Sequence, residues 1–185
     1  MPSKDDPALL IIDMFSKFDF PDAAALAPSA VRAARQIARL KEAAAKQACP
    51  VIYINDNFAE WKRDFKELVE ICLQTPGTPG TIAKLLLPTP DDYSILKPKH
   101  SAFLSTPLSI LLAKLGSRRL LITGTAADSC IAATCFDANS REYETLVVRE
   151  AVAGIGARKT RALKLIEDAQ AAKVVPIETV LKALR

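Results

Sequence analysis

The sequence predicts an α/β protein: a three-layer α/β/α sandwich whose mostly parallel sheet has about six strands. Short apolar runs, typical of strands buried on both faces, recur along the chain. They alternate with longer segments whose apolar residues have helical spacing, which indicates strand–helix–strand units with right-handed crossovers. No internal repeat or low-complexity segment interrupts this order, so we expect residues 1–185 to form a single domain.

The first half of the chain is predicted to contribute two strands and two helices. Residues 8–12 form a continuous apolar run that ends at Asp13, and residues 51–54 form a second run of the same kind. Between them, residues 22–48 are rich in alanine, arginine and lysine and carry apolar side chains at helical spacing. Residues 60–73 show the same spacing, which predicts a helix after the second strand.

The second half is predicted to continue the alternation after a loop. Residues 75–92 are rich in proline and glycine, so we expect a loop that could carry one helical turn. Long loops in compact domains often serve active sites. A domain linker is the alternative, but the part of the chain that follows does not look self-sufficient. The remaining strands are predicted over residues 93–97, 119–123, 144–148 and 173–175, and the remaining helices over residues 107–115, 130–141 and 158–172.

The composition is that of an ordinary globular protein, with 50% hydrophobic and 25% charged residues. The formal net charge is +4, and the basic residues are interspersed with acidic ones instead of clustering as in a nucleic-acid-binding surface. No apolar run approaches the ~20 residues that span a bilayer, and residues 1–7 lack the features of a signal peptide. We therefore expect a cytoplasmic protein that acts on a small molecule, with neither nucleic acid nor membrane as a partner.

Polar residues follow four of the predicted strands, at the ends where open parallel sheets bind ligands. Asp13 ends the first strand and residues 55–57 (Asn-Asp-Asn) end the second. Lys97 ends the third strand, and Cys130 lies just beyond the fourth. We expect these side chains to gather along one edge of the sheet.

Cys130 is the strongest candidate for chemistry among the four cysteines. It lies near the predicted start of a helix, where the partial positive charge of the N-terminus favours the nucleophilic thiolate. A buried, inert cysteine is the alternative. We adopt that alternative for the other three, which are Cys49, Cys72 and Cys135. The four cysteines lack the spacing of a metal site and are expected to be free thiols.

Asp13 and Lys97 are the candidate partners of Cys130. Asp13 ends a buried strand, where an unpaired carboxylate is costly, so it is either a helix cap or a general base beside a cation. Cysteine hydrolases usually pair the thiol with a histidine, but the only histidine, His100, offers no base if it lies on the surface. Lys97 is the alternative cation, because a lysine at a strand end can stabilise both a thiolate and Asp13.

Three segments resemble, in order, the signature regions of the isochorismatase-like cysteine hydrolases. The segments are residues 10–14 (LIIDM), residues 96–103 (LKPKHSAF) with residues 106–108 (TPL), and residues 121–130 (LITGTAADSC). The strand–helix alternation agrees with that family over nearly the whole chain, so the resemblance implies its α/β fold.

The resemblance implies a catalytic triad with Asp13 as base, Lys97 as charged partner and Cys130 as nucleophile. It also implies a cis peptide bond between Thr125 and Ala126, which would turn the backbone N–H groups of Ala126 and Cys130 toward an oxyanion. The implied reaction is hydrolysis of a small-molecule amide or related C–N bond through a covalent thioester-type intermediate. The resemblance also implies a homo-oligomer, and we expect no cofactor.

The chain departs from the nicotinamidases of this family at their metal site. Those enzymes hold a metal after the second strand with one aspartate and several histidines. Here Asp56 is followed by Asn57 and Phe58, and no histidine lies nearby. We therefore expect no bound metal, and nicotinamidase activity is disfavoured. Residues 53–61 instead resemble a metal-free branch of the family.

Two other functions remain compatible with these residues. One is hydrolysis of a vinyl ether, as in isochorismate, using Asp13; Cys130 argues against it because that reaction needs no cysteine nucleophile. The other is a non-catalytic ligand-binding module on the same fold, which would have no need for all three residues. A dinucleotide-binding domain is disfavoured, since no Gly-x-Gly-x-x-Gly follows the first strand.

Phe18, Asn55 and Trp61 are candidates for substrate contact. Phe18 lies five residues after Asp13, and Trp61 is the only tryptophan. Either ring could form a pocket wall that stacks on a planar ligand, with core packing as the alternative. Asn55 is included because it lies at the end of the second strand, beside the expected site.

Overall fold

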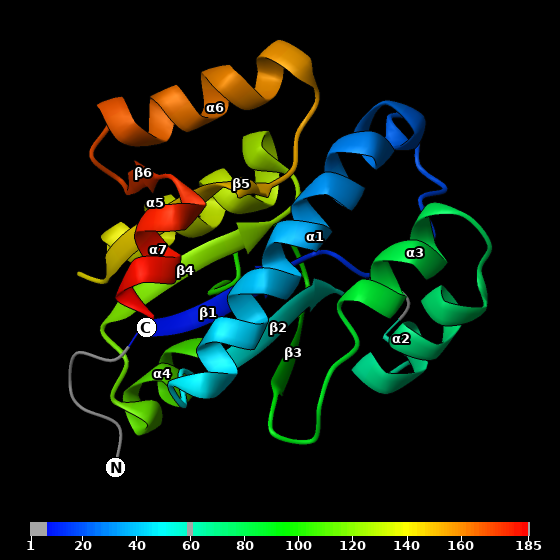
Figure 1. Ribbon diagram of the computed structural model, residues 1–185, viewed down its shortest axis with the longest axis horizontal. Coiled ribbons are helices and arrows are strands. Elements are labelled where there is room, and N and C mark those ends of the chain that lie inside the picture. The colour runs from blue at the N-terminus through cyan, green and yellow to red at the C-terminus, as the bar shows by residue number, and fades with distance from the viewer. Residues whose placement is uncertain (1–6, 59–60, 185) are drawn as a thin grey trace.

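The computed structural model describes residues 7–58 and 61–184 (Figure 1). Within these residues, six parallel strands form one sheet in the order β3-β2-β1-β4-β5-β6. The strands are β1 (Pro7–Ile12), β2 (Val51–Asp56), β3 (Tyr93–Lys97), β4 (Arg119–Gly124), β5 (Glu144–Val152) and β6 (Lys173–Val175). The α-helices are α1 (Ala23–Lys46), α2 (Phe65–Gln74), α3 (Thr78–Leu85), α4 (Leu108–Leu115), α5 (Ala132–Asn139), α6 (Gly156–Asp168) and α7 (Ile177–Ala183). The predicted three-layer α/β/α sandwich is confirmed.

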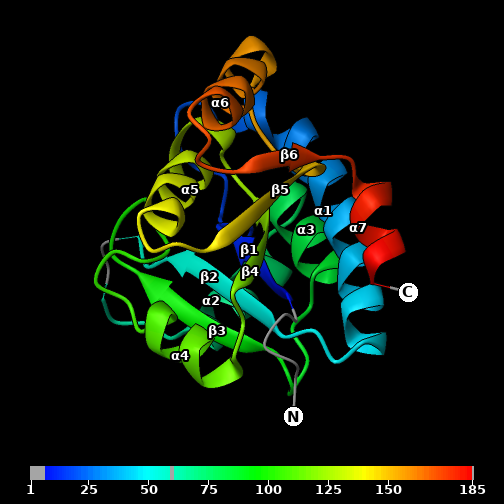
Figure 2. The same cartoon turned by 90° about the vertical axis from the view of Figure 1, so that its left-hand side faces the viewer.

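The sheet separates two hydrophobic cores, as expected when successive side chains of a strand point to opposite faces. Leu9 and Ile11 of β1 belong to the core beneath α1, α2, α3 and α7. Leu10 and Ile12 belong to the core beneath α4, α5 and α6. Figure 2 shows α1 and α7 on one side of the sheet and α4 and α5 on the other. β1 is buried on both faces, which is why its sequence is continuously apolar.

α1 is 24 residues long and packs along the sheet with an alanine-rich face. Its buried positions include Ala30, Ala34 and Ile37, at the spacing that places side chains on one side of a helix. Charged residues occupy the opposite side, so α1 is amphipathic. None of the described helices, α1 included, is both long and apolar enough to cross a membrane.

Three segments differ from what the sequence predicts. The stretch predicted as a loop contains the eight-residue helix α3, whose Ile82 and Ala83 are buried in the core beneath α1. β5 extends beyond residue 148 to Val152. The helix α7 was not predicted, although Ile177 and Val180 complete the same core as α1. The helices α3 and α7 are short, and their burial depends on tertiary contacts that local periodicity does not reveal.

The strand registers bring the carboxyl ends of four strands to one edge of the sheet. Ile12, the last residue of β1, is paired with Ile54 of β2 and with Gly124 of β4. Asp56 of β2 is paired with Lys97 of β3. The residues that follow these pairs therefore start from neighbouring positions on the same edge.

Candidate active site

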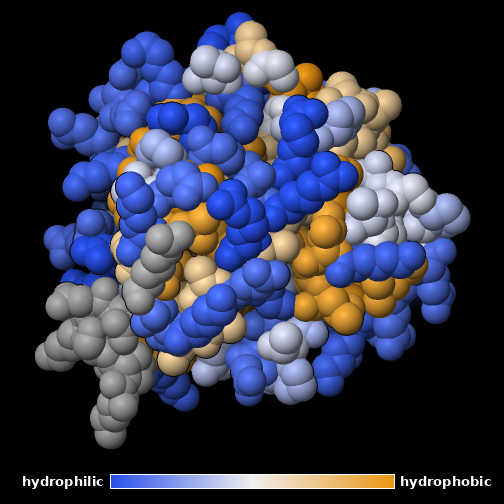
Figure 3. Space-filling model, viewed as in Figure 1, coloured by the Kyte–Doolittle hydropathy of each residue, from blue (hydrophilic) through white to orange (hydrophobic). Residues whose placement is uncertain are grey.

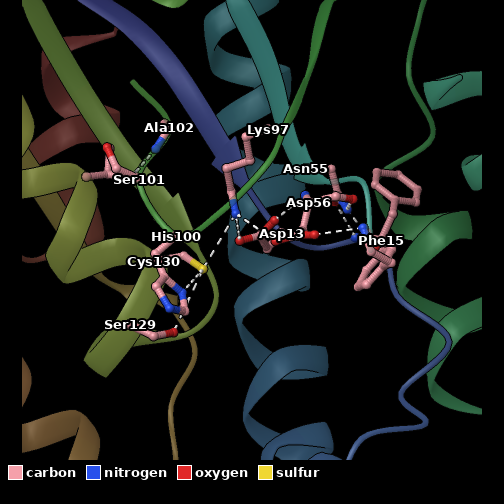
Figure 4. Close-up of polar contacts among 12 residues, drawn as sticks. Asp13, Phe15, Asn55, Asp56, Lys97, His100, Ser101, Ala102, Ser129 and Cys130 are labelled. Carbon is pink, nitrogen blue, oxygen red and sulfur yellow. Dashed lines mark hydrogen bonds and ion pairs between the residues drawn. The ribbon is translucent and has the colours of Figure 1, made fainter. Parts of the chain in front are cut away.

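Lys97 lies at the centre of the polar cluster at this edge of the sheet. Its side chain is completely buried, and its amine Nζ lies 2.7 Å from Asp13 Oδ2 and 3.6 Å from Cys130 Sγ (Figure 4). A second carboxylate oxygen, Asp56 Oδ2, lies 3.7 Å from the same amine. The neighbouring Lys99 is exposed to solvent. The structure thus brings Asp13, Lys97 and Cys130 together and leaves Lys99 outside the cluster.

Backbone contacts hold Asp13 in place immediately after β1. Its φ of 52° is in the left-handed region, and its N–H donates to Ile54 O at 2.9 Å. The N–H of Asp56 donates to Asp13 Oδ1 at 2.6 Å, while the other carboxylate oxygen faces Lys97. The first described helix after Asp13 is α1, which begins at Ala23. Asp13 is therefore not a helix cap, and the alternative of a carboxylate held beside a cation is the one observed.

The loop that carries Cys130 is fixed directly against the end of β1. Gly124 has a φ of 118°, and a Cβ at this position would lie 2.0 Å from the backbone oxygen of Ile12, so only glycine fits. The next residue, Thr125, donates its N–H to the same oxygen at 2.9 Å. The Thr125–Ala126 peptide bond is cis. This close approach of two backbones places the loop beside Asp13.

Cys130 lies in a π-helical turn, Ala127–Ile131, that precedes α5. The backbone N–H of Ile131 donates to Ala126 O at 3.2 Å, which is the wide i to i+5 pattern of such a turn. Turns of this kind occur frequently at functional sites. Among the four cysteines, Cys130 is partly exposed, whereas Cys49, Cys72 and Cys135 are buried, as expected for inert core residues.

Burial and charge determine the protonation of the cluster. Burial raises the pKa of Asp13 above the usual range of a carboxyl, although Lys97 opposes this shift. Burial also opposes the charge on Lys97, but Asp13 and the neighbouring acidic groups outweigh it and raise the pKa of the amine. Asp13 is therefore more basic than an ordinary aspartate, and the adjacent Lys97 amine favours its ionised form.

The expectation of a stabilised thiolate at Cys130 is wrong for the resting site. Burial raises the pKa of the Cys130 thiol to about 12, and the negative charge of Asp13 adds to this shift. Lys97 and Ser129 lower the pKa, but they do not compensate for burial and Asp13. The sulfur is therefore protonated near neutral pH, with the Asp13 carboxylate in its immediate neighbourhood.

A cavity of about 480 Å³ opens onto the sulfur. Its described lining includes Asp13, Ser16, Phe18, Asp19, Phe20, Leu26, Asp56, Phe58, His100, Thr125, Ala126, Ser129 and Cys130. The rings of Phe18 and Phe20 form one apolar part of the wall, with their centroids 5.8 Å apart. A smaller cavity of about 240 Å³ adjoins it, and Asp19, Asp56 and Phe58 line both. The volume and the mixed lining suit a small molecule with an apolar part.

Of the three predicted substrate contacts, Phe18 lines the cavity but Asn55 and Trp61 do not. Asn55 is buried, and its side chain bridges backbone segments: Oδ1 accepts from Phe15 N–H at 3.0 Å and Nδ2 donates to Phe15 O at 2.9 Å (Figure 4). Trp61 is 72% exposed and is not among the described residues that line the cavity. In this structure Asn55 fixes the chain after β1, and Trp61 lies on the surface outside the described cavity lining.

His100 and Asp56 also lie at this site, although the sequence alone assigned neither a role and placed Asp56 only among the residues expected at this edge. His100 is exposed, yet its Nδ1 lies 3.9 Å from Cys130 Sγ (Figure 4), and it is one of the residues that line the cavity. Its position three residues after Lys97, as the only histidine, was the available signal. Asp56 faces Lys97 and lines both cavities. Its place at the end of β2, next to Lys97 in the sheet register, was the signal for this residue.

Comparison with known proteins assigns the chain to a family. The isochorismatase domain model matches residues 7–179. An uncharacterised isochorismatase family protein of Bacillus subtilis, YaaI, is 35% identical, covering 97% of this chain and 99% of that protein. Maleamate amidohydrolase of Pseudomonas putida is 31% identical over 79% of this chain and 71% of its own length. A solved isochorismatase family protein from Desulfovibrio vulgaris has a TM-score of 0.76 at 27% identity, covering 97% of this chain and 98% of that one. The chain therefore belongs to the isochorismatase family of hydrolases.

Proposed function

We propose that this hydrolase cleaves a small-molecule amide or related C–N bond, with Cys130 as nucleophile, Asp13 as base and Lys97 as their charged partner. The observation that carries the proposal is the buried Lys97 amine, which lies 2.7 Å from the Asp13 carboxylate and 3.6 Å from the Cys130 sulfur. The similarity to maleamate amidohydrolase supports amide hydrolysis as the type of reaction.

The first half of the proposed reaction transfers an acyl group to sulfur. The substrate carbonyl lies in the cavity above Cys130, and Sγ forms a bond to its carbon while the thiol proton passes to Asp13. The carbonyl electron pair moves to oxygen, and the N–H groups of Ala126 and Cys130 are the proposed donors to this oxyanion. When the C–N bond breaks, Asp13 returns the proton to the departing nitrogen, which leaves as ammonia or an amine.

The second half releases the acid and restores the thiol. Water attacks the thioester carbon and gives its proton to Asp13, and the C–S bond then breaks as the proton passes to the sulfur. Lys97 keeps its proton throughout in this scheme. Its charge holds Asp13 ionised between transfers and stabilises the thiolate character that develops at Sγ.

The raised pKa of Cys130 is compatible with this order of events. A thiol whose pKa is about 12 is a poor nucleophile by itself. An adjacent base removes that limitation, because the proton leaves as the S–C bond forms. Asp13 and the thiol contact the same Lys97 amine, at 2.7 Å and 3.6 Å, so the proposed base lies beside the proton that it accepts.

Mass spectrometry of the intact protein tests the proposal. The chain is incubated with a library of small amides and quenched in acid, and a covalent acyl adduct is then sought by peptide mapping. We expect the adduct on the peptide that contains Cys130, and none in the Cys130→Ala variant. If Cys130→Ala still turns over a vinyl ether such as isochorismate, the second candidate reaction using Asp13 replaces this one. Binding of amides without any adduct or product would favour a non-catalytic module.

A further inference from the structure

A second cavity, of about 510 Å³, lies apart from the candidate active site and is rich in positive charge. It is formed where α1 passes the end of β5 and the start of α6 (Figure 1). Hydrophilic side chains predominate over the upper part of the face shown in Figure 3, with apolar patches between them. The cavity shares none of its described lining residues with the cavity above Cys130.

Three basic side chains line this cavity: Arg32, Arg35 and Lys159. Arg32 and Arg35 are three residues apart on α1, so both lie on the same side of that helix. Neither arginine forms an ion pair with any residue that the structure describes. Glu150 is the single carboxylate among the described lining residues. The cavity therefore carries an excess of positive charge that the described residues do not neutralise.

The surroundings of Lys159 show the effect of this charge. Burial lowers the pKa of the Lys159 amine, and Arg32 and Arg149 lower it further, although Glu150 opposes them. The amine donates to the backbone oxygen of Arg149 at 3.0 Å, which keeps it in place at the cavity wall. A bound anion would relieve the repulsion among these cations.

The backbone at the cavity wall adds to the same preference. Gly156 lines the cavity and is the first residue of α6, a 13-residue helix whose N-terminus carries partial positive charge. Gly154, also in the lining, packs closely, since a Cβ there would lie 2.8 Å from Lys159 Cβ. Two arginines that can each donate in parallel, a lysine and a helix N-terminus are the groups that proteins use to hold phosphate.

We propose that this cavity binds a small molecule through its phosphate group or groups, with Arg32, Arg35 and Lys159 as the recognising side chains. The proposal is independent of the proposed amide hydrolysis, because it uses none of the residues at the Cys130 cavity. The cavity is large enough for a phosphate ester with an organic part, and Ser29 and Gln36 in its lining can contact polar groups of that part.

Isothermal titration of the full chain with inorganic pyrophosphate tests this site. We expect binding of one pyrophosphate per chain that weakens as salt is raised, as for exposed charges. The double variant Arg32→Ala/Arg35→Ala should weaken binding by about tenfold or more, because each arginine supplies charge-assisted hydrogen bonds. The matched control is Arg39→Ala on the same helix, since Arg39 pairs with Glu178 at 2.9 Å and does not line the cavity.

A variant that is expected to strengthen binding distinguishes a specific effect on the cavity from a general loss of folding. Glu150→Gln removes the negative charge but keeps an acceptor for Ile177 N–H, which Glu150 Oε2 now binds at 2.8 Å. This variant should bind pyrophosphate more tightly than the parent. The proposal is wrong if pyrophosphate does not bind at millimolar concentration or if the double variant binds it unchanged. It is equally wrong if Arg39→Ala has the larger effect, or if a single-stranded oligonucleotide binds this face and pyrophosphate does not.

Discussion

Replacement of Lys97 by methionine is the most direct test of the proposed triad. Methionine keeps much of the volume of the buried side chain but removes the ammonium group that lies 2.7 Å from Asp13. Removing one partner of a buried ion pair typically costs about 3–5 kcal/mol, because the other charge is left uncompensated. Protonation of Asp13 avoids that cost, so the free energy is expressed as a shift of its pKa.

The size of the shift determines the expected loss of activity. One pKa unit corresponds to about 1.4 kcal/mol, so the pKa of Asp13 should rise by about 2–4 units from a value that burial has already raised. Asp13 would then be protonated at neutral pH and unable to accept the thiol proton. Each unit by which that pKa exceeds the pH removes about tenfold of the active form, so we expect kcat/KM at pH 7 to fall by about tenfold or more.

The pH profile distinguishes this explanation from simple damage to the fold. In Lys97→Met, part of the lost activity should return as the pH rises through the elevated pKa of Asp13. The control Lys99→Ala should keep kcat/KM within about twofold, because exposed side chains outside a site rarely affect it. Circular dichroism and thermal melting establish that both variants are folded. The reasoning fails if Lys97→Met has normal kcat/KM at pH 7, or if Lys99→Ala is the more damaging change.

Four further predictions use the same site. In the parent enzyme, the acidic limb of kcat/KM should lie at a pH above the usual range of an aspartate, because the active form needs ionised Asp13 and burial raises the pKa of that group; a limb at or below pH 4 would contradict this assignment. Iodoacetamide should label Cys130 before the three buried cysteines, and its rate should still be rising above pH 9 because the Cys130 pKa is about 12; peptide mapping that finds Cys49, Cys72 or Cys135 labelled first would reject it. Activity should survive EDTA, since no three His, Cys, Asp or Glu side chains among the described residues are placed to hold a metal; inactivation that zinc or iron reverses would show otherwise. Phe18→Ala should raise KM several-fold through loss of the cavity wall, whereas Trp61→Ala, on the exposed surface, should leave KM unchanged; equal effects of the two would count against the cavity as the binding site.

The fold was predictable because its strongest local signals agree with the tertiary structure. The apolar run of β1 is buried on both faces, and the helical spacing of residues 22–48 corresponds to the buried side of α1. Short elements were harder to predict. The sequence of α3 contains Pro79 and Gly80, residues typical of loops, yet its Ile82 is fully buried in the core. Such a helix is stabilised mainly by packing.

The rule that ligands bind at strand ends located the site but did not resolve its individual side chains. Asn55 and Asp56 are adjacent at the end of β2, and successive side chains of a strand point to opposite faces. Asp56 is in register with Lys97 and faces the cavity, so Asn55 points away and bonds to Phe15. The order of the strands in the sheet was needed to decide whether Asn55 or Asp56 faces the site. Trp61 could not be placed by this rule, because it follows the strand at a distance.

The protonation of Cys130 shows that its position near a helix N-terminus was not enough to predict a thiolate. A protonated sulfur needs a base beside it. The N-terminus of a helix favours a thiolate, but here the sulfur is also buried and lies beside the carboxylate of Asp13. Those two effects outweigh the opposing effects of Lys97 and Ser129. A nucleophile held as a thiol needs a base that is ionised before the substrate arrives and basic enough to take the proton. Burial makes Asp13 more basic, and the charge of Lys97 favours its ionised form. In the proposed mechanism, the buried Lys97 is therefore needed chiefly to favour the ionised form of Asp13. Ionised Asp13 can then accept the proton of the Cys130 thiol.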